Sequence, residues 1–292
     1  MEVVFLFFVA VFGLPGPGSC STQSTRVSPG FQGTQMNFID NGGLFLLSND
    51  SSFAFGFVNN GPQDSTSFTL AVVHQATATV VWTANRGRPV THSDNFVFGD
   101  DGNAYLQSGG ATVWSTGSAN KGVVGMELRD TGNLVLLSSA NSSSDPVWQS
   151  FSYPTDTLLS GQRFSQGMKL VSKPNANNLS YSLEIGAGDM MLYAGFRHPQ
   201  PYWSMQQEKR KIKNAFRGEI YSAVLNSSSW NVYDQNQSLL SQFVAGGDSS
   251  DSSVVWAVVL GSDGFLSFYS LQKRGLQHRF SGQDTAGLLR HA

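Results

Sequence analysis

A tryptophan that returns in the same apolar setting constrains the fold of this chain more than any other feature. Val81-Trp82-Thr83, Val113-Trp114-Ser115 and Val147-Trp148-Gln149 are three copies of one short segment. The tryptophans are 32 and 34 residues apart (114 − 82 and 148 − 114). A period of this length indicates repeated units that cannot bury their apolar faces alone. We therefore expect a closed three-fold object in which Trp82, Trp114 and Trp148 meet at the centre as core residues.

The segments between these tryptophans are typical of short strands joined by tight turns. In the first unit, strands are predicted at Asn37–Ile39, Phe53–Val58 and Phe68–Val73. In the second and third units, Gly99–Gly102 and Asp130–Gly132 separate apolar runs and have hairpin chemistry, because glycine accepts a positive φ. Charged residues make up only 13% of the chain, well below the usual ~25%. The sequence predicts an all-β first domain over residues 29–153.

A second, looser β domain is expected over residues 161–272. It contains further apolar strands, such as Val254–Leu260. Trp203, Trp230 and Trp256 are 27 and 26 residues apart (230 − 203 and 256 − 230), which we interpret as a shorter version of the first period. Between the two domains, Ser152–Leu159 is either a linker or a packed turn that closes the first domain. We favour the packed turn.

The two ends of the chain differ from the rest. Val3–Phe12 is an apolar run of ten residues followed by small residues, which predicts a signal peptide over residues 1–20. Glu2 departs from the usual basic start, and the alternative is a buried N-terminal strand. The run is too short for a membrane span of ~20 residues, and no longer one follows. At the other end, residues 273–292 show no alternation, so we expect a disordered tail or the end of an incomplete gene model.

The expected compartment is extracellular. Cleavage after Cys20 leaves a mature chain without cysteine, which must be stabilised by core burial and not by disulfides. A net charge of −2 argues against a nucleic-acid partner, and the one basic run, residues 209–213, is predicted as a solvated loop. Five Asn-x-Ser sequons support glycosylation on a secretory route. They are Asn49, Asn141, Asn178, Asn226 and Asn236.

Three motifs in order resemble the bulb-type (monocot mannose-binding) lectin domain of plant G-type lectin S-receptor-like serine/threonine kinases. They are Val81–Arg86, Asp130–Leu136, and Val147–Phe151 with Pro154–Leu159. The resemblance covers about residues 34–162, and a softer one continues into the second lectin-like half of such ectodomains and of related secreted epidermal glycoproteins. It implies a β-prism, which is three four-stranded sheets around a pseudo-three-fold axis, followed by a second, looser lectin-like β-prism. The chain is then a receptor ectodomain truncated before the transmembrane and kinase parts.

The resemblance also implies a sugar site. Mannose-binding members carry Gln-x-Asp-x-Asn-x-Val-x-Tyr on one strand of each unit, and a spacing of two puts these side chains on one sheet face. In the second unit, Asp101 and Asn103 match the pattern and Tyr105 stands in the place of Val. In the third unit, Asn133 and Val135 match. These five are the candidate carbohydrate-binding residues.

The pattern is degenerate in every unit. Gly99 and Gln107 replace the Gln and the Tyr in the second unit, and nothing around Asp50–Phe57 matches in the first. Each missing hydrogen bond to a sugar removes about 0.5–1.5 kcal/mol of binding free energy. A weak site in the second unit is therefore the most that the pattern supports.

The sequence favours a non-catalytic recognition module that binds a mannose-type glycan or a cell-surface protein. The alternative is a structural secreted glycoprotein or receptor-ectodomain fragment that binds no sugar. An enzyme is disfavoured because acids such as Asp100, Asp130 and Asp263 sit in turns, where none forms the carboxylate pair of a glycosidase. The five histidines lack metal-ligand spacing, so no metal or cofactor is expected. A dimer is compatible with the sequence.

Overall fold

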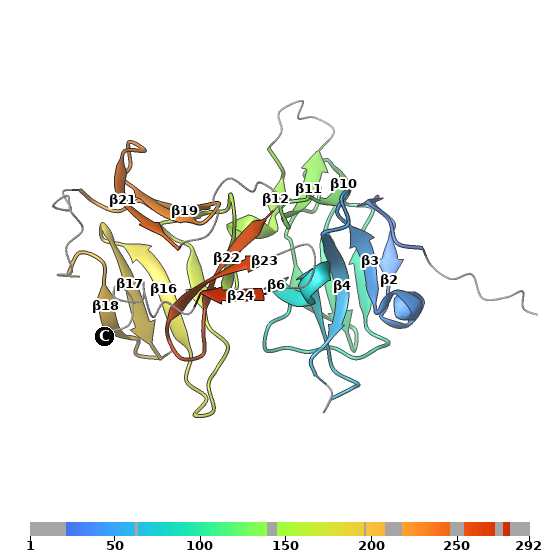
Figure 1. Cartoon of the computed structure of the whole chain (residues 1–292). Coiled ribbons are helices and arrows are strands. Elements are labelled where there is room, and N and C mark those ends of the chain that lie inside the picture. Colours follow the sequence, from blue (N-terminus) through green and yellow to red (C-terminus); the bar gives the residue numbers. More distant parts are fainter. Residues whose placement is uncertain are drawn as a thin grey trace, which may run out of the picture.

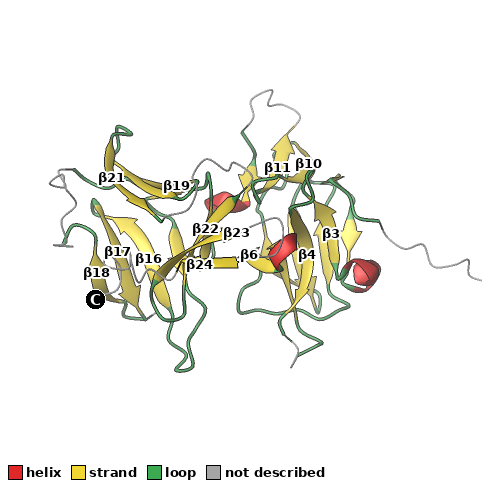
Figure 2. Ribbon diagram, viewed as in Figure 1, coloured by secondary structure: helices red, strands yellow, loops and turns green. Residues whose placement is uncertain are grey.

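The computed structural model describes residues 22–61, 64–138, 145–195, 197–207, 218–245, 254–271 and 277–280. Over these ranges, strands dominate, and the helices are the short 3-10 segments η1 (Met36–Asn41), η2 (Gln75–Thr77) and η3 (Ser150–Ser152) (Figure 2). The strands form six antiparallel sheets of four strands each, which confirms the all-β prediction. The predicted signal peptide, the basic run at 209–213 and the sequon at Asn141 lie outside the described residues.

Three of the sheets are built from the first half of the chain, and we call them the first prism. Their strands, in the order in which they pair, are β3 (Leu44–Leu47), β4 (Phe53–Asn59), β5 (Phe68–His74) and β6 (Thr79–Thr83); β2 (Gln32–Gly33), β7 (Asn95–Phe98), β8 (Ala104–Ser108) and β9 (Ala111–Ser115); and β1 (Arg26–Val27), β10 (Val123–Leu128), β11 (Leu134–Ser138) and β12 (Trp148–Gln149).

The other three sheets form the second prism. Their strands are β13 (Thr157–Leu159), β22 (Val255–Leu260), β23 (Leu266–Leu271) and β24 (Gln277–Phe280); β14 (Arg163–Ser165), β19 (Ser222–Asn226), β20 (Ser229–Tyr233) and β21 (Leu239–Val244); and β15 (Lys169–Val171), β16 (Tyr181–Gly186), β17 (Asp189–Ala194) and β18 (Gln200–Ser204). Strand β24 pairs with β23 inside the predicted disordered tail, so that prediction is wrong for these four residues.

Both prisms have the same nested topology. Each begins with three short edge strands, and three meanders of three strands follow and pair with these edges in reverse order. In the first prism, β3, β2 and β1 pair with β4, β7 and β10; in the second, β15, β14 and β13 pair with β16, β19 and β22. The last meander of each prism therefore closes it against its first strand. The prisms lie side by side, and β22–β24 face the β6 side of the first prism (Figure 1).

The three tryptophans of the first prism meet as predicted. Their ring centroids are 5.7–5.9 Å apart in all three pairs, with interplanar angles of 71–75°. Such edge-to-face contacts add stability beyond area burial. However, Trp114 is only partly buried, so the three tryptophans are not the least solvent-exposed part of the core. That part is a cluster of phenylalanines with at most 1% exposure, namely Phe45, Phe53, Phe55, Phe57, Phe96 and Phe98.

The predicted strand at Asn37–Ile39 is instead the 3-10 segment η1. The side chains of Thr34 and Asn37 bond each other's backbone amides at 3.2 and 3.0 Å, which favours a turn over an extended strand. Gly42 ends the segment at φ +64°. Phe38 still reaches the core, with its ring 5.5 Å from that of Phe45. Phe38 therefore contributes to the core from a turn and not from a strand.

The interpretation of the second tryptophan period is wrong. Trp203 lies on an outer strand opposite Leu192, next to a bulge, in the same register as Trp82 opposite Val72. Trp230 lies on β20, the middle strand of its meander, and Trp256 lies on β22, the first strand of its meander. On β21 the matching position is Ser241, opposite Val232. The near-equal spacing of the three tryptophans therefore does not reflect equivalent positions.

The segment Ser152–Leu159 belongs to both prisms. Trp82 donates from Nε1 to the carbonyl of Tyr153 at 2.8 Å, and the Tyr153 ring stacks on Trp148 with centroids 5.7 Å apart. The first part of the segment is therefore a packed turn, as we favoured. Its last three residues form β13, the first strand of the second prism, which the sequence analysis missed.

Candidate functional site

The β7–β8 and β10–β11 hairpins, which carry the candidate sugar residues, have the same backbone geometry. Gly99 donates to the carbonyl of Asn103 at 2.9 Å, and Arg129 donates to that of Asn133 at 3.0 Å. The glycines at the fourth position, Gly102 and Gly132, have φ of +80° and +82°, which strongly favours glycine. Asn103 and Asn133 are therefore structurally equivalent, as the sequence pattern predicts.

In the β7–β8 hairpin, Asp101 and Tyr105 flank Gly99. Asp101 is exposed, and its Oδ1 accepts a hydrogen bond from the Asn103 amide at 2.9 Å. A Cβ added at Gly99 would lie 2.8 Å from that oxygen and 3.6 Å from the Tyr105 ring. A side chain at position 99 would therefore require the Asp101 carboxylate to move.

Asn103 holds the segment that follows β9. Its Oδ1 accepts hydrogen bonds from the hydroxyls of Ser115 and Thr116 and from the amide of Ser118, each at 3.1 Å. Its Nδ2 has no hydrogen-bond partner in the part of the chain that the structure describes. The side chain is only partly buried. Asn103 can therefore still donate one side-chain hydrogen bond to a ligand, while its oxygen is fully used.

Asn133 and Val135 are less accessible. Asn133 is 4% exposed; its Nδ2 donates to Gln149 Oε1 at 2.8 Å, and its Oδ1 accepts from the Ser150 hydroxyl and the Phe151 amide at 3.2 Å. Val135 is fully buried. These two residues fasten β11 to the segment that carries Trp148. In this conformation neither side chain has a free face for a sugar.

The equivalent positions in the first unit lie on a different strand from the one considered in the sequence. Val72 faces Trp82 across β5 and β6 just as Leu106 faces Trp114. By this register, Thr69 and Ala71 take the places of Asn103 and Tyr105. The segment Asp50–Phe57 is therefore the wrong place to look for the pattern. The correct strand lacks the pattern too.

A third hairpin, between β22 and β23, has the same geometry, and its partial match to the sugar pattern was missed. Gly261 donates to Phe265 O at 2.9 Å, and Gly264 has φ +83°. Asp263 Oδ1 accepts from the Phe265 amide at 3.1 Å, as Asp101 does from that of Asn103. Counting from this turn, Tyr269 stands at the Tyr position of the pattern. The Gly-x-Asp-Gly turn with a tyrosine five residues after it was the signal in the sequence.

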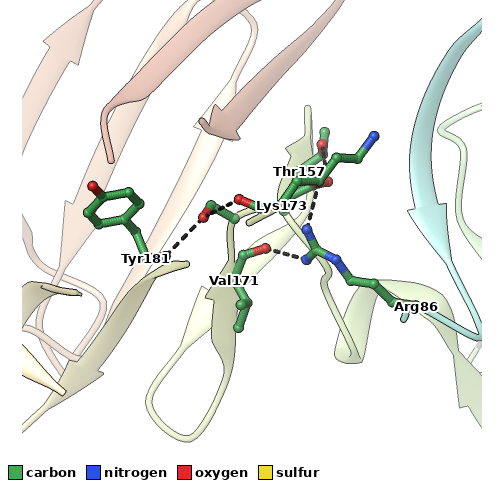
Figure 3. Close-up of polar contacts among 7 residues, drawn as sticks. Arg86, Thr157, Val171, Lys173 and Tyr181 are labelled. Atoms are coloured by element: carbon green, nitrogen blue, oxygen red, sulfur yellow. Dashed lines mark hydrogen bonds and ion pairs between the residues drawn. The ribbon is translucent and has the colours of Figure 1, made fainter. Parts of the chain in front are cut away.

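The remaining motif residues join the two prisms. Arg86 Nη2 lies 3.2 Å from Asp156 Oδ2, and Nη1 donates to the carbonyl of Val171 (Figure 3). The Arg86 and Asp156 side chains are 28% and 15% exposed. Burial lowers the pKa of the Arg86 guanidinium, and the Asp156 charge opposes this shift. Arg86 nevertheless stays charged at neutral pH, so this ion pair, which we call the Arg86 clamp, couples β6 to the second prism.

Four of the five predicted glycosylation sites lie in the described part of the chain, on its surface. The sequon asparagines Asn49, Asn178, Asn226 and Asn236 are all exposed. Over the described ranges, no three His, Cys, Asp or Glu side chains are grouped so that they could hold a metal ion. In the same part of the chain, no helix has the length and apolar character needed to cross a membrane.

Comparison with known proteins places these features in a family. The family profile "D-mannose binding lectin" matches residues 79–182. The chain is 44% identical over 275 residues to the G-type lectin S-receptor-like serine/threonine-protein kinase SD2-5 of Arabidopsis thaliana, covering 93% of this chain and 32% of that protein. It is 43% identical over 154 residues to the epidermis-specific secreted glycoprotein EP1 of Daucus carota, covering 49% of this chain and 38% of EP1. The chain thus spans about a third of the length of these curated relatives.

Among solved structures, the chain is similar to a monomeric monocot mannose-binding lectin from Gastrodia elata. The TM-score is 0.32 at 18% identity, over 44% of this chain and 96% of the lectin. It is also similar to the two-domain fetuin-binding agglutinin of Scilla campanulata, with a TM-score of 0.29 at 15% identity, over 85% of this chain and 92% of the agglutinin.

Proposed function

Because this chain is a bulb-type lectin domain protein that resembles the lectin region of plant G-type lectin S-receptor-like kinases, we propose that it is a secreted or cell-surface recognition module. In this proposal it binds a mannose-type glycan weakly, through the β7–β8 hairpin, and catalyses no reaction. The matching family profile and the secreted relative EP1 support the ligand class and the extracellular location.

One observation carries the choice of hairpin. The β7–β8 turn presents a carboxylate and an amide, from Asp101 and Asn103, and the outward positions of β8 add an aromatic ring and a second amide, from Tyr105 and Gln107. The carboxylate accepts and the amides donate hydrogen bonds to neighbouring sugar hydroxyls, and the ring can pack against the apolar face of a hexose. The equivalent residues of the third unit have no free face.

The expected affinity is low. Two or three net hydrogen bonds of about 0.5–1.5 kcal/mol each, with one ring contact, reach roughly the 4 kcal/mol that corresponds to a Kd near 1 mM. Multivalent display of the glycan is then needed for firm retention.

A second candidate function is supported by the use of the asparagine oxygens. Asn103 and Asn133 each accept hydrogen bonds from two or more groups of the chain itself. On this view the hairpins serve only to tie strands together. The chain would then be a structural glycoprotein or ectodomain fragment that binds no sugar.

Retention on mannose-agarose separates the two candidates. We expect the chain to be retained and the Tyr105→Ala/Gln107→Ala variant to be eluted early, because the variant lacks two of the proposed sugar contacts. The variant should still fold, since neither side chain has a hydrogen-bond partner among the described residues. Asp101→Ala/Asn103→Ala should also lose retention. Val124→Ala, at an exposed position on β10, is the control and should behave like the unchanged chain.

Two results contradict the proposal. If the double variants are retained as well as the unchanged chain, the β7–β8 site is wrong. If the unchanged chain is not retained and binds no glycan on an array, the structural candidate replaces it.

A further inference from the structure

A cleft of about 450 Å³ lies between the two prisms, beside the Arg86 clamp. One wall is the start of β6, with Ala78, Thr79 and Val80. The other wall is one face of β22 and β23. Its lining residues there are Ala257, Val259, Tyr269 and Leu271. The volume falls within the range of about 300–1,000 Å³ that is typical of small-ligand sites.

The walls combine an apolar floor with hydroxyl groups. Ala257, Val259 and Leu271 supply the floor, and Tyr269 is the one aromatic side chain of the lining. Tyr269 pairs with Ala257 across the two strands and is partly exposed, and its phenol has no hydrogen-bond partner in the described part of the chain. Hydroxyls of threonine and serine border the same space. An aromatic face with polar groups around it is suited to a sugar ring, which is apolar on its faces and polar at its edge.

The charged residues of the lining are Asp156 and Lys173. Asp156 is neutralised by Arg86, and its Oδ1 also accepts from the Thr157 hydroxyl at 3.0 Å. Lys173 is exposed, and its backbone carbonyl accepts from Ser172 Oγ at 2.9 Å. No ion pair or hydrogen bond among the described residues involves its ammonium group, and no dashed line reaches it in Figure 3. The cleft therefore carries one uncompensated positive charge.

We propose that this cleft binds an acidic saccharide, with the carboxylate of a uronic-acid residue facing Lys173 and the sugar ring against Tyr269. The site is separate from the β7–β8 hairpin and goes beyond the function proposed above. It needs both prisms, because β6 supplies one wall and β22–β23 supply the other. The Arg86 clamp positions these walls, and Lys173 sets the preference for charge.

The test is calorimetric titration of the whole chain with trigalacturonic acid and with its methyl ester, which has the same rings without the charges. We expect the acid to bind at least about fivefold more tightly than the ester, with an affinity that falls as salt is raised. Lys173→Gln should remove this difference. Lys121→Gln, at an exposed lysine of the first prism that is not among the residues lining the cleft, is the matched control and should preserve it.

A second variant tests the location. Ser262→Trp places a large side chain at an exposed position on the rim, and it should abolish binding of the acid without changing the thermal unfolding temperature. If the acid does not bind, if the ester binds equally well, or if Lys173→Gln and Ser262→Trp bind the acid as the unchanged chain does, the inference is wrong. Titration with methyl α-mannoside distinguishes the two sites, since failure of the β7–β8 hairpin leaves acid binding intact, and failure of the cleft leaves mannoside binding intact.

Discussion

The two prisms share one strand topology but have different centres. In the first, Trp82, Trp114 and Trp148 occupy the same position on three outer strands and touch one another. In the second, only Trp203 keeps that register, and Ser241 stands in an equivalent place. The second core is instead filled mainly by aliphatic side chains such as Leu170 and Leu183. Nested strand pairing therefore does not depend on the tryptophans, which fill one of several cores that the same topology accepts.

The structural role of the hairpin asparagines is also filled by a different residue in the second prism. Asn103 and Asn133 tie the start of the middle strand of a sheet to the segment that follows its outer strand. In the β17–β18 sheet, Asp189 takes this place and accepts from the amide of Gln206 at 3.1 Å and from the Ser204 hydroxyl. A strand-tying role is thus common to both prisms. Sugar binding, where it occurs, is an additional use of the side-chain groups that remain free.

The largest expected effect is the loss of a first-prism tryptophan. Trp82→Ala should lower the free energy of unfolding of the first prism by about 3–5 kcal/mol, because it empties a buried site and removes two ring contacts. Trp203→Ala, at the equivalent but partly exposed position, should cost clearly less. Urea unfolding followed by circular dichroism measures both. Equal losses would mean that the two centres are energetically alike.

Next in size is the removal of a strand-tying amide. Asn133→Ala should destabilise the first prism by about 2–3 kcal/mol, since it leaves the Phe151 amide and Gln149 without their partner in a buried setting. Asn103→Ala should cost about 1–2 kcal/mol, because its surroundings are partly open to water. Thermal melts of the two variants give this order. The reverse order would contradict the assignment of Asn133 as the more deeply buried tie.

Loss of the Arg86 clamp should have a smaller effect on the free energy of unfolding and a clear effect on how cooperatively the two prisms unfold. Arg86→Met leaves the Asp156 carboxylate without its ion pair and should cost about 1 kcal/mol, a value reduced by the partial exposure of both side chains. Calorimetry should then resolve the unfolding of the two prisms into more widely separated transitions. Lys169→Met, which breaks the exposed ion pair with Glu184 inside the second prism, is the control and should leave the transitions as they are. An unchanged profile in Arg86→Met would show that the clamp does not couple the prisms.

The smallest effect is a pH dependence of stability that arises from His74 in the first prism. His74 is 1% exposed, and burial lowers its pKa below the ordinary value of 6.5, partly opposed by the charge of Asp50. The unfolded chain therefore binds a proton before the folded one does, so stability is retained above about pH 6.5 and falls as the pH drops below it. The loss is at most about 1.4 kcal/mol per pH unit. Melting His74→Asn and the unchanged chain between pH 7 and pH 5 should show a shallower decline in the variant.

The part of the fold that the sequence predicts is the part that depends on local pattern. Alternation and glycine turns indicated the long strands, and the hairpins at Gly99–Gly102 and Asp130–Gly132 have the geometry expected of them. The edge strands of two or three residues, such as Gln32–Gly33, were missed, since segments this short show no period. For the site, the pattern correctly aligned Asn103 with Asn133. It could not distinguish them, because their difference lies in burial by residues that are distant in the sequence.

The sequence by itself determined that this chain is all-β, that three indole rings converge, and which turns present polar side chains. Each of these follows from spacing along the chain, and spacing is a local property. Tertiary structure alone decided that Arg26 pairs with Glu127, that Val135 is covered, and that Lys173 and Tyr269 line one cleft with Thr79. These outcomes depend on which distant segments pack together, and packing is set by the free energy of the whole core and not by any one segment of it.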